Sequence, residues 1–253
     1  MRLLAFERMI ANTDSWGWIG GHNIYAYKGT VNPWRLLPWD LDISLGATAQ
    51  ADGYEMAGLF DDPGDGRTFN SDPVLKQMIA HPPFRRMFWR AVQDAVQGPL
   101  RPVEMNPIMD ANYGHIQPAY TATGPGAAPL LSPDQSMSYV PSLRAWITNR
   151  HAFLSQQLAT VNAPFEISNN GGNNFTVTNQ STVTLLGQAP VAVAFLRLNG
   201  AGNNAAVTWT SVTNWSLSVP LTSGANGFSV EGYNRLNGAI SGASDSITIT
   251  KQP

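Results

Sequence analysis

Cysteine is absent from this 253-residue sequence, which excludes disulfide bonds, thiolate metal sites and thiol catalysis. A strong charge of either sign is also missing, because the formal net charge is only -2. This near balance argues against nucleic acid or an anionic membrane as a partner. No apolar run approaches the roughly 20 residues of a membrane span. The composition therefore predicts neither a nucleic-acid partner nor a transmembrane helix.

The first ten residues lack the apolar core of a signal peptide, because Glu7 and Arg8 interrupt the run. Leu3, Leu4, Met9 and Ile10 instead have the spacing of an amphipathic helix. We therefore expect the chain to start inside a domain whose earlier part is missing.

The composition changes near residue 162. Residues 163–253 contain only six charged side chains and are rich in Asn, Gly, Ser, Thr and Val. Short β-prone runs separated by turn residues recur at 174–178, 181–186, 191–196, 207–209, 215–219, 227–233 and 245–250. About seven strands in ~90 residues are typical of an immunoglobulin-like β-sandwich. Two domains are therefore predicted, at 1–162 and 163–253.

Residues 1–162 have a different pattern, with a hairpin followed by helices. Asp72-Pro73 is a favourable helix start, and His81-Pro-Pro83 is expected to break that helix before it resumes from Phe84 to Gln97. Further helices are expected at 102–120 and 140–158, with a loop at 121–133 between them. The fold class predicted for the whole chain is α+β, with a mainly helical lobe that carries a β-hairpin and an all-β sandwich domain.

Two acidic residues, Asp40 and Asp42, interrupt the apolar run 36–46. Strands disfavour Asp, and a buried carboxylate is costly unless it is paired or binds a metal. Residues 23–28 and 34–40 are predicted to form an antiparallel hairpin. Pairing of Lys28 near Arg35 would bring Asn23 opposite Asp40, so one end of the hairpin gathers Asp40 and Asn23.

Asp14 follows the first helix and precedes Asn23 by nine residues. A cluster of carboxylate and amide oxygens suits a hard cation such as Mg²⁺. In protein kinases, an Asp accepts the substrate proton, and an Asn followed by an Asp beyond a hairpin holds Mg²⁺. The same order occurs here with Asp14, Asn23 and Asp40. Taken singly, the acids also fit simpler roles, such as a turn cap or an ion pair with Arg35.

Three segments carry a family resemblance: Asn12-Thr-Asp14-Ser-Trp16, His22-Asn-Ile-Tyr-Ala-Tyr27 and Leu37-Pro-Trp-Asp-Leu-Asp-Ile-Ser-Leu-Gly46. Together they resemble the CotH kinase family, the spore-coat atypical protein kinases, and the similarity extends over about residues 1–160. The resemblance implies a kinase-like C-terminal lobe that uses ATP and Mg²⁺ or Mn²⁺ to phosphorylate protein Ser or Thr. By motif position it implies Asp14 as the catalytic base and Asn23, Asp40 and Asp42 as metal ligands, with the principal aspartate left open.

A kinase also needs a phosphate-covering loop and a Lys that pairs with the phosphates. Only 13 residues precede Asp14, and the lysines before the sandwich, Lys28 and Lys76, lie in the predicted hairpin and a predicted helix. We therefore expect the N-terminal lobe to be missing and this chain to be weakly active or inactive. The run Gly17-Trp-Ile-Gly-Gly21 and the acidic segment 61–66 are interpreted as a flexible loop and a solvated turn.

An alternative function is a non-catalytic cell-surface scaffold, with a degenerate kinase lobe used for adhesion or carbohydrate contact. Exposed Trp209, Trp215 and Tyr233 could stack on sugars, although a core position is expected for at least one Trp. Either function suits an extracellular or cell-envelope protein of a bacterium, with a protein substrate or a cell-surface partner.

Overall fold

The computed structural model describes residues 1–12, 14–16, 23–31, 33–42, 44–46, 59–60, 73–120, 130–137 and 141–253. The chain divides into two compact units. The first contains Met1–Ala80 and Ala91–Leu158, and the second contains His81–Arg90 and Ala159–Pro253. Residues 81–90 thus join the unit that holds the strand-rich C-terminal part, whereas the predicted boundary at 162/163 remains a prediction.

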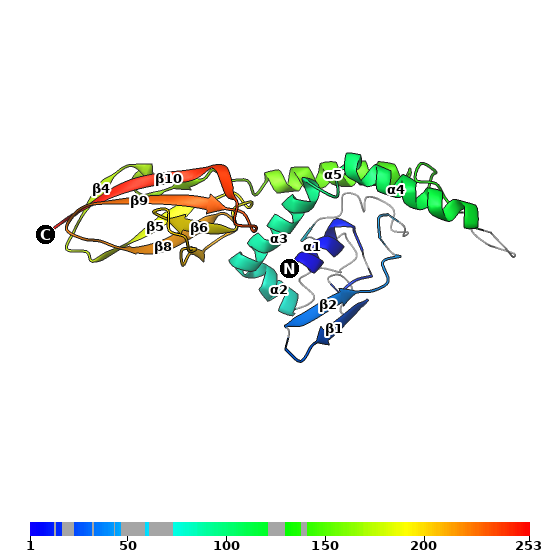
Figure 1. Cartoon of the computed structure of the whole chain (residues 1–253), viewed down its shortest axis with the longest axis horizontal. Coiled ribbons are helices and arrows are strands. Elements are labelled where there is room, and N and C mark those ends of the chain that lie inside the picture. Colours follow the sequence, from blue (N-terminus) through cyan, green and yellow to red (C-terminus); the bar gives the residue numbers. More distant parts are fainter. Residues whose placement is uncertain are drawn as a thin grey trace. The chain divides into compact units, whose positions relative to one another are not determined.

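The first unit contains helices and a hairpin, as Figure 1 shows. Its elements are α1 (Arg2–Met9), β1 (Ile24–Lys28), β2 (Trp34–Pro38), α2 (Pro73–Ala80), the end of α3 (Pro82–Val96), α4 (Pro102–Ile116), the 3₁₀ turn η2 (Gln117–Ala119) and α5 (Leu143–Ala159). The predicted helices are present, with small shifts at their ends. No helix among the described residues is both long and apolar enough to cross a bilayer.

The two prolines after His81 begin α3 rather than delay it. Pro82 and Pro83 occupy its first turn, where a backbone N–H has no helical partner to lose. The prediction that α3 starts at Phe84 is therefore two residues late. The expected N-cap Asp72 and most of the expected loop 121–133 lie outside the described residues.

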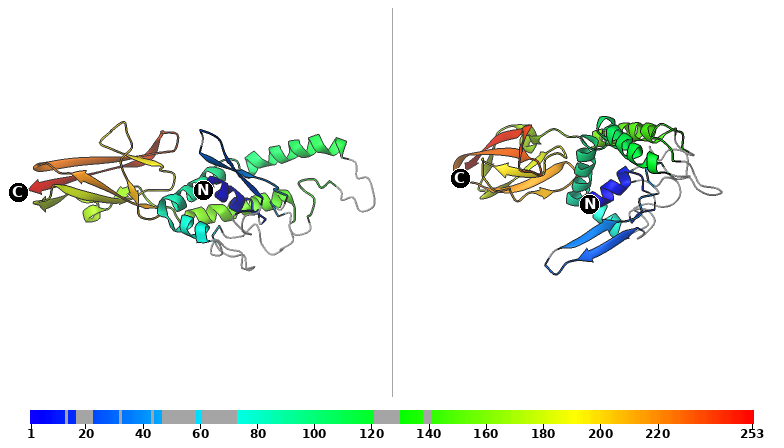
Figure 2. Two further views of the ribbon diagram at one scale, coloured as in Figure 1. Left: turned by 90° about the horizontal axis from the view of Figure 1, so that it is seen from below. Right: turned by 45° about the vertical axis from the view of Figure 1, so that its right-hand side comes forward.

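The second unit contains two four-stranded sheets, and Figures 1 and 2 show them as two layers. One sheet has the order β4-β10-β9-β6 and the other β3-β5-β8-β7. The strands are β3 (Glu166–Ile167), β4 (Phe175–Thr178), β5 (Thr182–Gln188), β6 (Phe195–Leu198), β7 (Thr208–Trp209), β8 (Asn214–Pro220), β9 (Gly224–Tyr233) and β10 (Ala239–Gln252). The predicted α+β class, with a helical lobe, a hairpin and an all-β sandwich, is confirmed.

The sandwich core contains side chains from both sheets. Ile247 and Ile249 of β10 are buried, whereas Ser246 just before this pair is exposed, so successive side chains point to opposite faces of the sheet. The expected strand at 191–196 begins only at Phe195, because Val193 donates its N–H to Pro190 in a turn. Val193 still reaches the core with no exposed surface.

Trp215 occupies the centre of this core with 1% of its surface exposed. Its ring lies over Gly187, the residue opposite it in the β5–β8 pair. A Cβ at Gly187 would come within 2.2 Å of the Trp215 ring and 2.3 Å of the Glu166 carbonyl oxygen. A residue without a side chain is required here by the close approach of the ring.

Candidate active site

Asp14 lies in the turn that follows α1. The helix ends when Ala11 takes a positive φ of 51°, and the Asn12 N–H then donates to the Glu7 carbonyl at 2.9 Å. Ala11 is 3% exposed, so this unusual backbone conformation is held by packing on every side. Asp14 is half-buried just beyond it.

Asn23 connects the start of the hairpin to Asp14. Its side-chain Nδ2 donates to the Asp14 backbone carbonyl at 2.8 Å and to the Asp14 Oδ2 at 3.0 Å. The two residues also share partial burial. The proposed base and the proposed amide ligand are thus in direct contact, although nine residues separate them.

The hairpin pairs in a register one residue away from the predicted one. Lys28 lies opposite Trp34 rather than Arg35, so Asn23 faces Trp39, whose N–H donates to the Asn23 carbonyl at 2.9 Å. A shift of one residue would turn each side chain to the other face of a continuous strand. Here β2 ends at Pro38, and Asp40 has a positive φ of 52°. The chain turns there, so Asp40 still approaches Asp14 despite the error in register.

Asp40 and Asp42 are exposed and lie close together after β2. The pKa of Asp40 is raised, first by a hydrogen bond with the Asp42 side chain and then by the negative charges of Asp42 and Asp14. A neighbouring negative charge disfavours ionisation of a carboxyl group, so the raised pKa of Asp40 reflects the proximity of Asp42 and Asp14. The structure therefore brings Asp14, Asn23, Asp40 and Asp42 to one place.

The segment after Asp42 returns to the end of α1. The Ser44 hydroxyl donates to the Leu41 carbonyl at 2.6 Å and closes a turn around Asp42. The Leu45 N–H then donates to the Ile10 carbonyl at 2.9 Å. Both acidic segments are consequently attached to the same end of α1.

The simpler role for the acids, pairing with Arg35, has no support in the structure. Arg35 lies on exposed β2, and no ion pair joins it to Asp40 or Asp42, all three of which are described. Lys28 lies over the Trp34 ring, 5.8 Å from its centroid. The glycine run 17–21 and the acidic segment 61–66 lie outside the described residues.

The donor set fits a small hard cation only if other ligands complete it. Among the described residues, no group of three or more histidine or acidic side chains is arranged to hold a metal ion. Two carboxylates and one amide are nevertheless a normal protein contribution for Mg²⁺, which takes its remaining ligands from water and phosphate oxygens. The ligand types present are therefore chemically compatible with Mg²⁺ or Mn²⁺.

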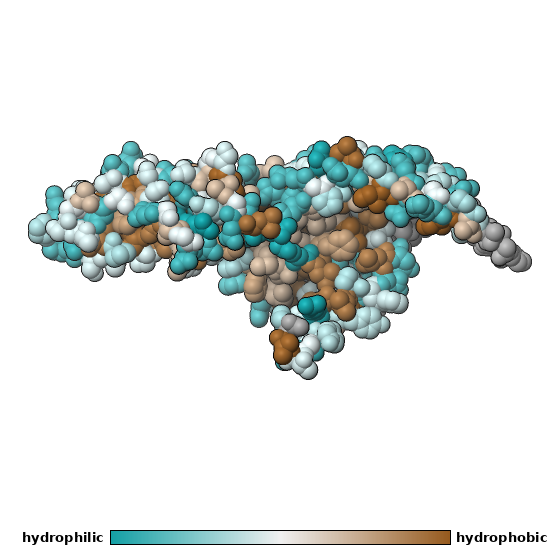
Figure 3. Space-filling view, in the orientation of Figure 1, coloured by the Kyte–Doolittle hydropathy of each residue, from teal (hydrophilic) through white to brown (hydrophobic). Residues whose placement is uncertain are grey.

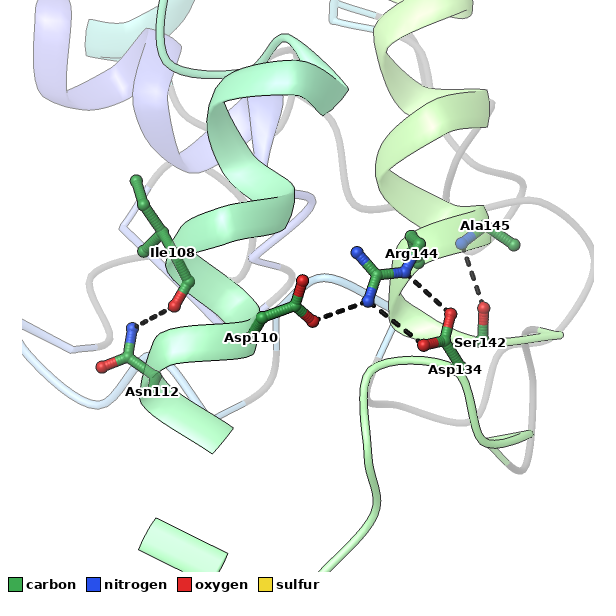
Figure 4. A network of polar contacts seen from close by, with 7 residues as sticks. All are labelled: Ile108, Asp110, Asn112, Asp134, Ser142, Arg144 and Ala145. Carbon is green, nitrogen blue, oxygen red and sulfur yellow. Dashed lines mark hydrogen bonds and ion pairs between the residues drawn. The ribbon is translucent and has the colours of Figure 1, made fainter. Parts of the chain in front are cut away.

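A cluster of exposed charged residues connects α4, α5 and the loop 130–137. Figure 4 shows that Arg144 of α5 contacts Asp110 of α4 and Asp134 of the loop, both at 2.7 Å. The two carboxylates raise the pKa of Arg144, and Arg144 lowers the pKa of Asp134. Sequence analysis did not find this cluster, because its members are separated by up to 34 residues.

Comparison with protein families identifies the N-terminal part of the chain, which contains Asp14, Asn23, Asp40 and Asp42. The profile described as "CotH kinase protein" matches residues 1–154, which is more than half of the chain. The chain belongs to the CotH kinase family. This result confirms the resemblance deduced from the motifs around Asp14, Asn23 and Asp40. No curated protein matches this CotH kinase family chain significantly.

Solved structures similar to this CotH family member cover about a third of it. The fibronectin(III)-like modules of CbhA from Clostridium thermocellum are 13% identical, with 35% of this chain and 99% of that chain covered and a TM-score of 0.25. Bacteroides ovatus SGBP-B, solved with a mixed-linkage heptasaccharide, is 22% identical, with 32% and 22% covered and a TM-score of 0.21. Both scores are too low to support an argument about this chain.

The aromatic residues considered for sugar contact are already engaged within the second unit. Trp215 is buried in the core. The Arg86 guanidinium lies 3.6 Å from the centroid of the Trp209 ring, and that of Arg197 lies 4.0 Å from the centroid of Tyr233. The prediction that one Trp is a core residue is confirmed, whereas the adhesion or carbohydrate function remains a prediction.

Proposed function

We propose that this CotH family chain transfers the γ-phosphoryl group of ATP to Ser or Thr hydroxyls of a protein substrate, with Mg²⁺ or Mn²⁺. The observation that supports this function is the direct contact between Asn23 and Asp14, at 2.8 and 3.0 Å, within the residues matched by the kinase family. The raised pKa of Asp40 beside Asp42 and Asp14 agrees with a site where a divalent cation would offset the negative charges.

The three metal-binding residues have distinct roles in this proposal. The Asn23 amide nitrogen is engaged with Asp14, which leaves its amide oxygen for the metal ion. Asp40 and Asp42 provide the carboxylate ligands, and either can be the principal one. When bound, the metal ion and ATP supply the positive charge and the phosphoryl group.

Asp14 would accept the proton of the attacking hydroxyl. Its Oδ2 receives the hydrogen bond from Asn23, which orients the carboxylate. A base needs to be within hydrogen-bond reach of the proton that it removes. The half-buried position of Asp14 limits competing water without closing the site.

The proposal includes an extracellular or cell-envelope location in a bacterium. Its support is the β-sandwich of the second unit, because this architecture is shared by many cell-surface domains. The substrate would then be a protein exposed in the same compartment.

Binding of Mn²⁺ tests the metal site directly. We expect the wild-type chain to reduce the electron paramagnetic resonance signal of free Mn²⁺, and Asp40→Asn and Asp42→Asn to weaken this effect. The larger loss identifies the principal ligand. Glu104→Gln is the matched control, because Glu104 is an exposed carboxylate of the same unit that pairs with Arg101. Equal binding by all four proteins would contradict the metal assignment.

Transfer of labelled phosphate tests the reaction. We expect slow labelling of an acceptor protein by the wild-type chain with γ-labelled ATP and Mn²⁺. Asp14→Asn should abolish it and leave Mn²⁺ binding intact, since the base is not a metal ligand in this proposal. Labelling by Asp14→Asn at the wild-type rate would remove Asp14 from the mechanism.

A further inference from the structure

Helix α5 places a buried face against the end of α1 within the first unit. Trp146 and Arg150, one turn apart on α5, are 0% and 1% exposed. The Arg150 Nε donates to the Met9 carbonyl at 2.9 Å, and a terminal guanidinium nitrogen donates to the Arg8 carbonyl at 2.6 Å. These carbonyls belong to the last turn of α1. Carbonyls in the last turn of a helix lack intrahelical N–H donors, and the helix dipole favours a cation there.

A buried cluster of Trp146, Ile147 and Ala11 lies close in sequence to both segments that carry the acids. Leu45 packs against this cluster. Ala11 lies three residues before Asp14, and Leu45 lies three residues after Asp42. The end of α1, the turn after Asp42 and the α5 face therefore meet at one point close in sequence to the acidic residues.

The hairpin β1–β2 has too little packing to hold Asp40 and Asp42 at a fixed distance from Asp14. All residues of β2 and most of β1 are exposed, and Figure 3 shows apolar atoms at the free end of this hairpin. A two-stranded hairpin is marginally stable without further packing. We infer that the position of Asp40 and Asp42 relative to Asp14 is set where the chain packs against α5, at the buried Ala11 and the partly buried Leu45.

We propose that Arg150 is a positioning residue for this site, acting with Trp146. The guanidinium binds the carbonyls of the last two residues of α1, and the buried cluster that contains the Trp146 ring holds Ala11 and Leu45, three residues from Asp14 and Asp42. Loss of the guanidinium would let the two acidic segments move apart. The consequence for metal binding rests on the proposed function, whereas the consequence for the end of α1 does not.

The test uses the whole chain with Arg150→Lys and Arg150→Met. Lysine keeps the positive charge, but its single ammonium group cannot reproduce the two hydrogen bonds that the planar guanidinium donates to the Arg8 and Met9 carbonyls. Arg101→Met is the matched control, because Arg101 is an exposed arginine of the same unit with an ion pair to Glu104. Circular dichroism and thermal melting establish that each variant is folded.

The first readout is hydrogen exchange at the Leu45 amide, which donates to Ile10. We expect exchange to rise about tenfold in Arg150→Lys and further in Arg150→Met, since opening of this contact becomes easier. If Arg150→Met does not fold, Arg150→Lys carries the test. Exchange in a folded Arg150→Lys protein that equals that of Arg101→Met would overturn the proposal.

The second readout is Mn²⁺ affinity, which a purely structural role would not change in a folded variant. We expect about tenfold weaker binding in Arg150→Lys, because small misplacements of ligands are costly. Wild-type affinity in Arg150→Lys would also overturn the positioning role. Absence of Mn²⁺ binding by the wild type would defeat the proposed metal site, and Leu45 exchange would still decide the role of Arg150.

Discussion

The two units of this chain bury polar groups to different extents. The second unit surrounds Trp215 with aliphatic side chains from both sheets. The first unit buries Glu7, Arg8, Asn12 and Ser15, each at most 1% exposed, around the turn that leads to Asp14. Buried polar groups stabilise less than apolar packing of equal size. The sandwich is thus organised for stability, whereas the lobe gives up some stability to hold its acidic residues.

Each unit nevertheless contains a buried arginine that donates to backbone carbonyls distant in sequence. Arg150 holds the end of α1 in the first unit. Arg86 in the second unit is 1% exposed and donates to the carbonyls of Ala189, Pro190, Val193 and Val212. Burial lowers the pKa of Arg86, while the carbonyl acceptors favour the charged guanidinium. The comparison predicts that substitutions at these arginines affect separate units.

The largest effect is expected for Arg86→Ala. It would leave buried carbonyls without a donor and uncover the Trp209 ring, at a cost of about 4 kcal/mol in the free energy of unfolding. Chemical denaturation measures the loss, and Leu45 exchange in the first unit should stay at the wild-type level. Arg85→Ala, at the exposed neighbouring residue, is the control. A parallel loss of Leu45 protection would break the comparison between the units.

A slightly smaller effect is expected for Gly187→Ala. The added methyl group would overlap the Trp215 ring and the Glu166 carbonyl, which we expect to cost about 3 kcal/mol. Near-ultraviolet circular dichroism would report displacement of Trp215. Gly202→Ala is the control, because no atom lies within 4 Å of the position that its added methyl group would occupy. Equal stability of the two variants would contradict the tight packing described for Trp215.

Arg144→Ala should have a modest effect, confined to the first unit. Arg144 contacts two exposed carboxylates, and water screens such surface pairs, so the melting temperature should fall only slightly. High salt should reduce the difference from wild type in thermal melts. A loss that is independent of salt would assign the effect to packing of α5 instead.

Asp40→Asn should have the smallest effect and the opposite sign. The pKa of Asp40 is raised, so the fold favours its protonated form, and its ionisation destabilises the protein as pH rises through that pKa. Without metal, the variant should therefore melt slightly above wild type at neutral pH and equal it in acid. Added Mn²⁺ should reverse the order. A variant that is less stable than wild type without metal at neutral pH would contradict the crowding of the acids.

Prediction from sequence was most successful where the signal is local. Helices α2, α3 and α4 start at prolines, and the sandwich strands from β4 to β10 coincide with β-prone runs, so these elements were predicted correctly. The hairpin register was wrong by one residue, because the connection between the two strands sets the register and the strand residues do not reveal it. The positive φ of Asp40, just after the strand, was likewise not evident from the sequence. Asp40 and Asp42 still lie near Asp14, because the chain changes direction at Asp40, after β2 has ended at Pro38.

The sequence by itself determined the family, the fold class and the order Asp14, Asn23, Asp40 and Asp42, because motifs and periodicity are local properties. Only the tertiary structure decided which distant contacts hold these elements in place. Arg150 binds carbonyls more than 140 residues earlier, and Arg86 binds carbonyls more than 100 residues later. Nothing in either helix distinguishes these arginines from solvated ones, since an acceptor on a distant backbone leaves no pattern in the sequence around the donor.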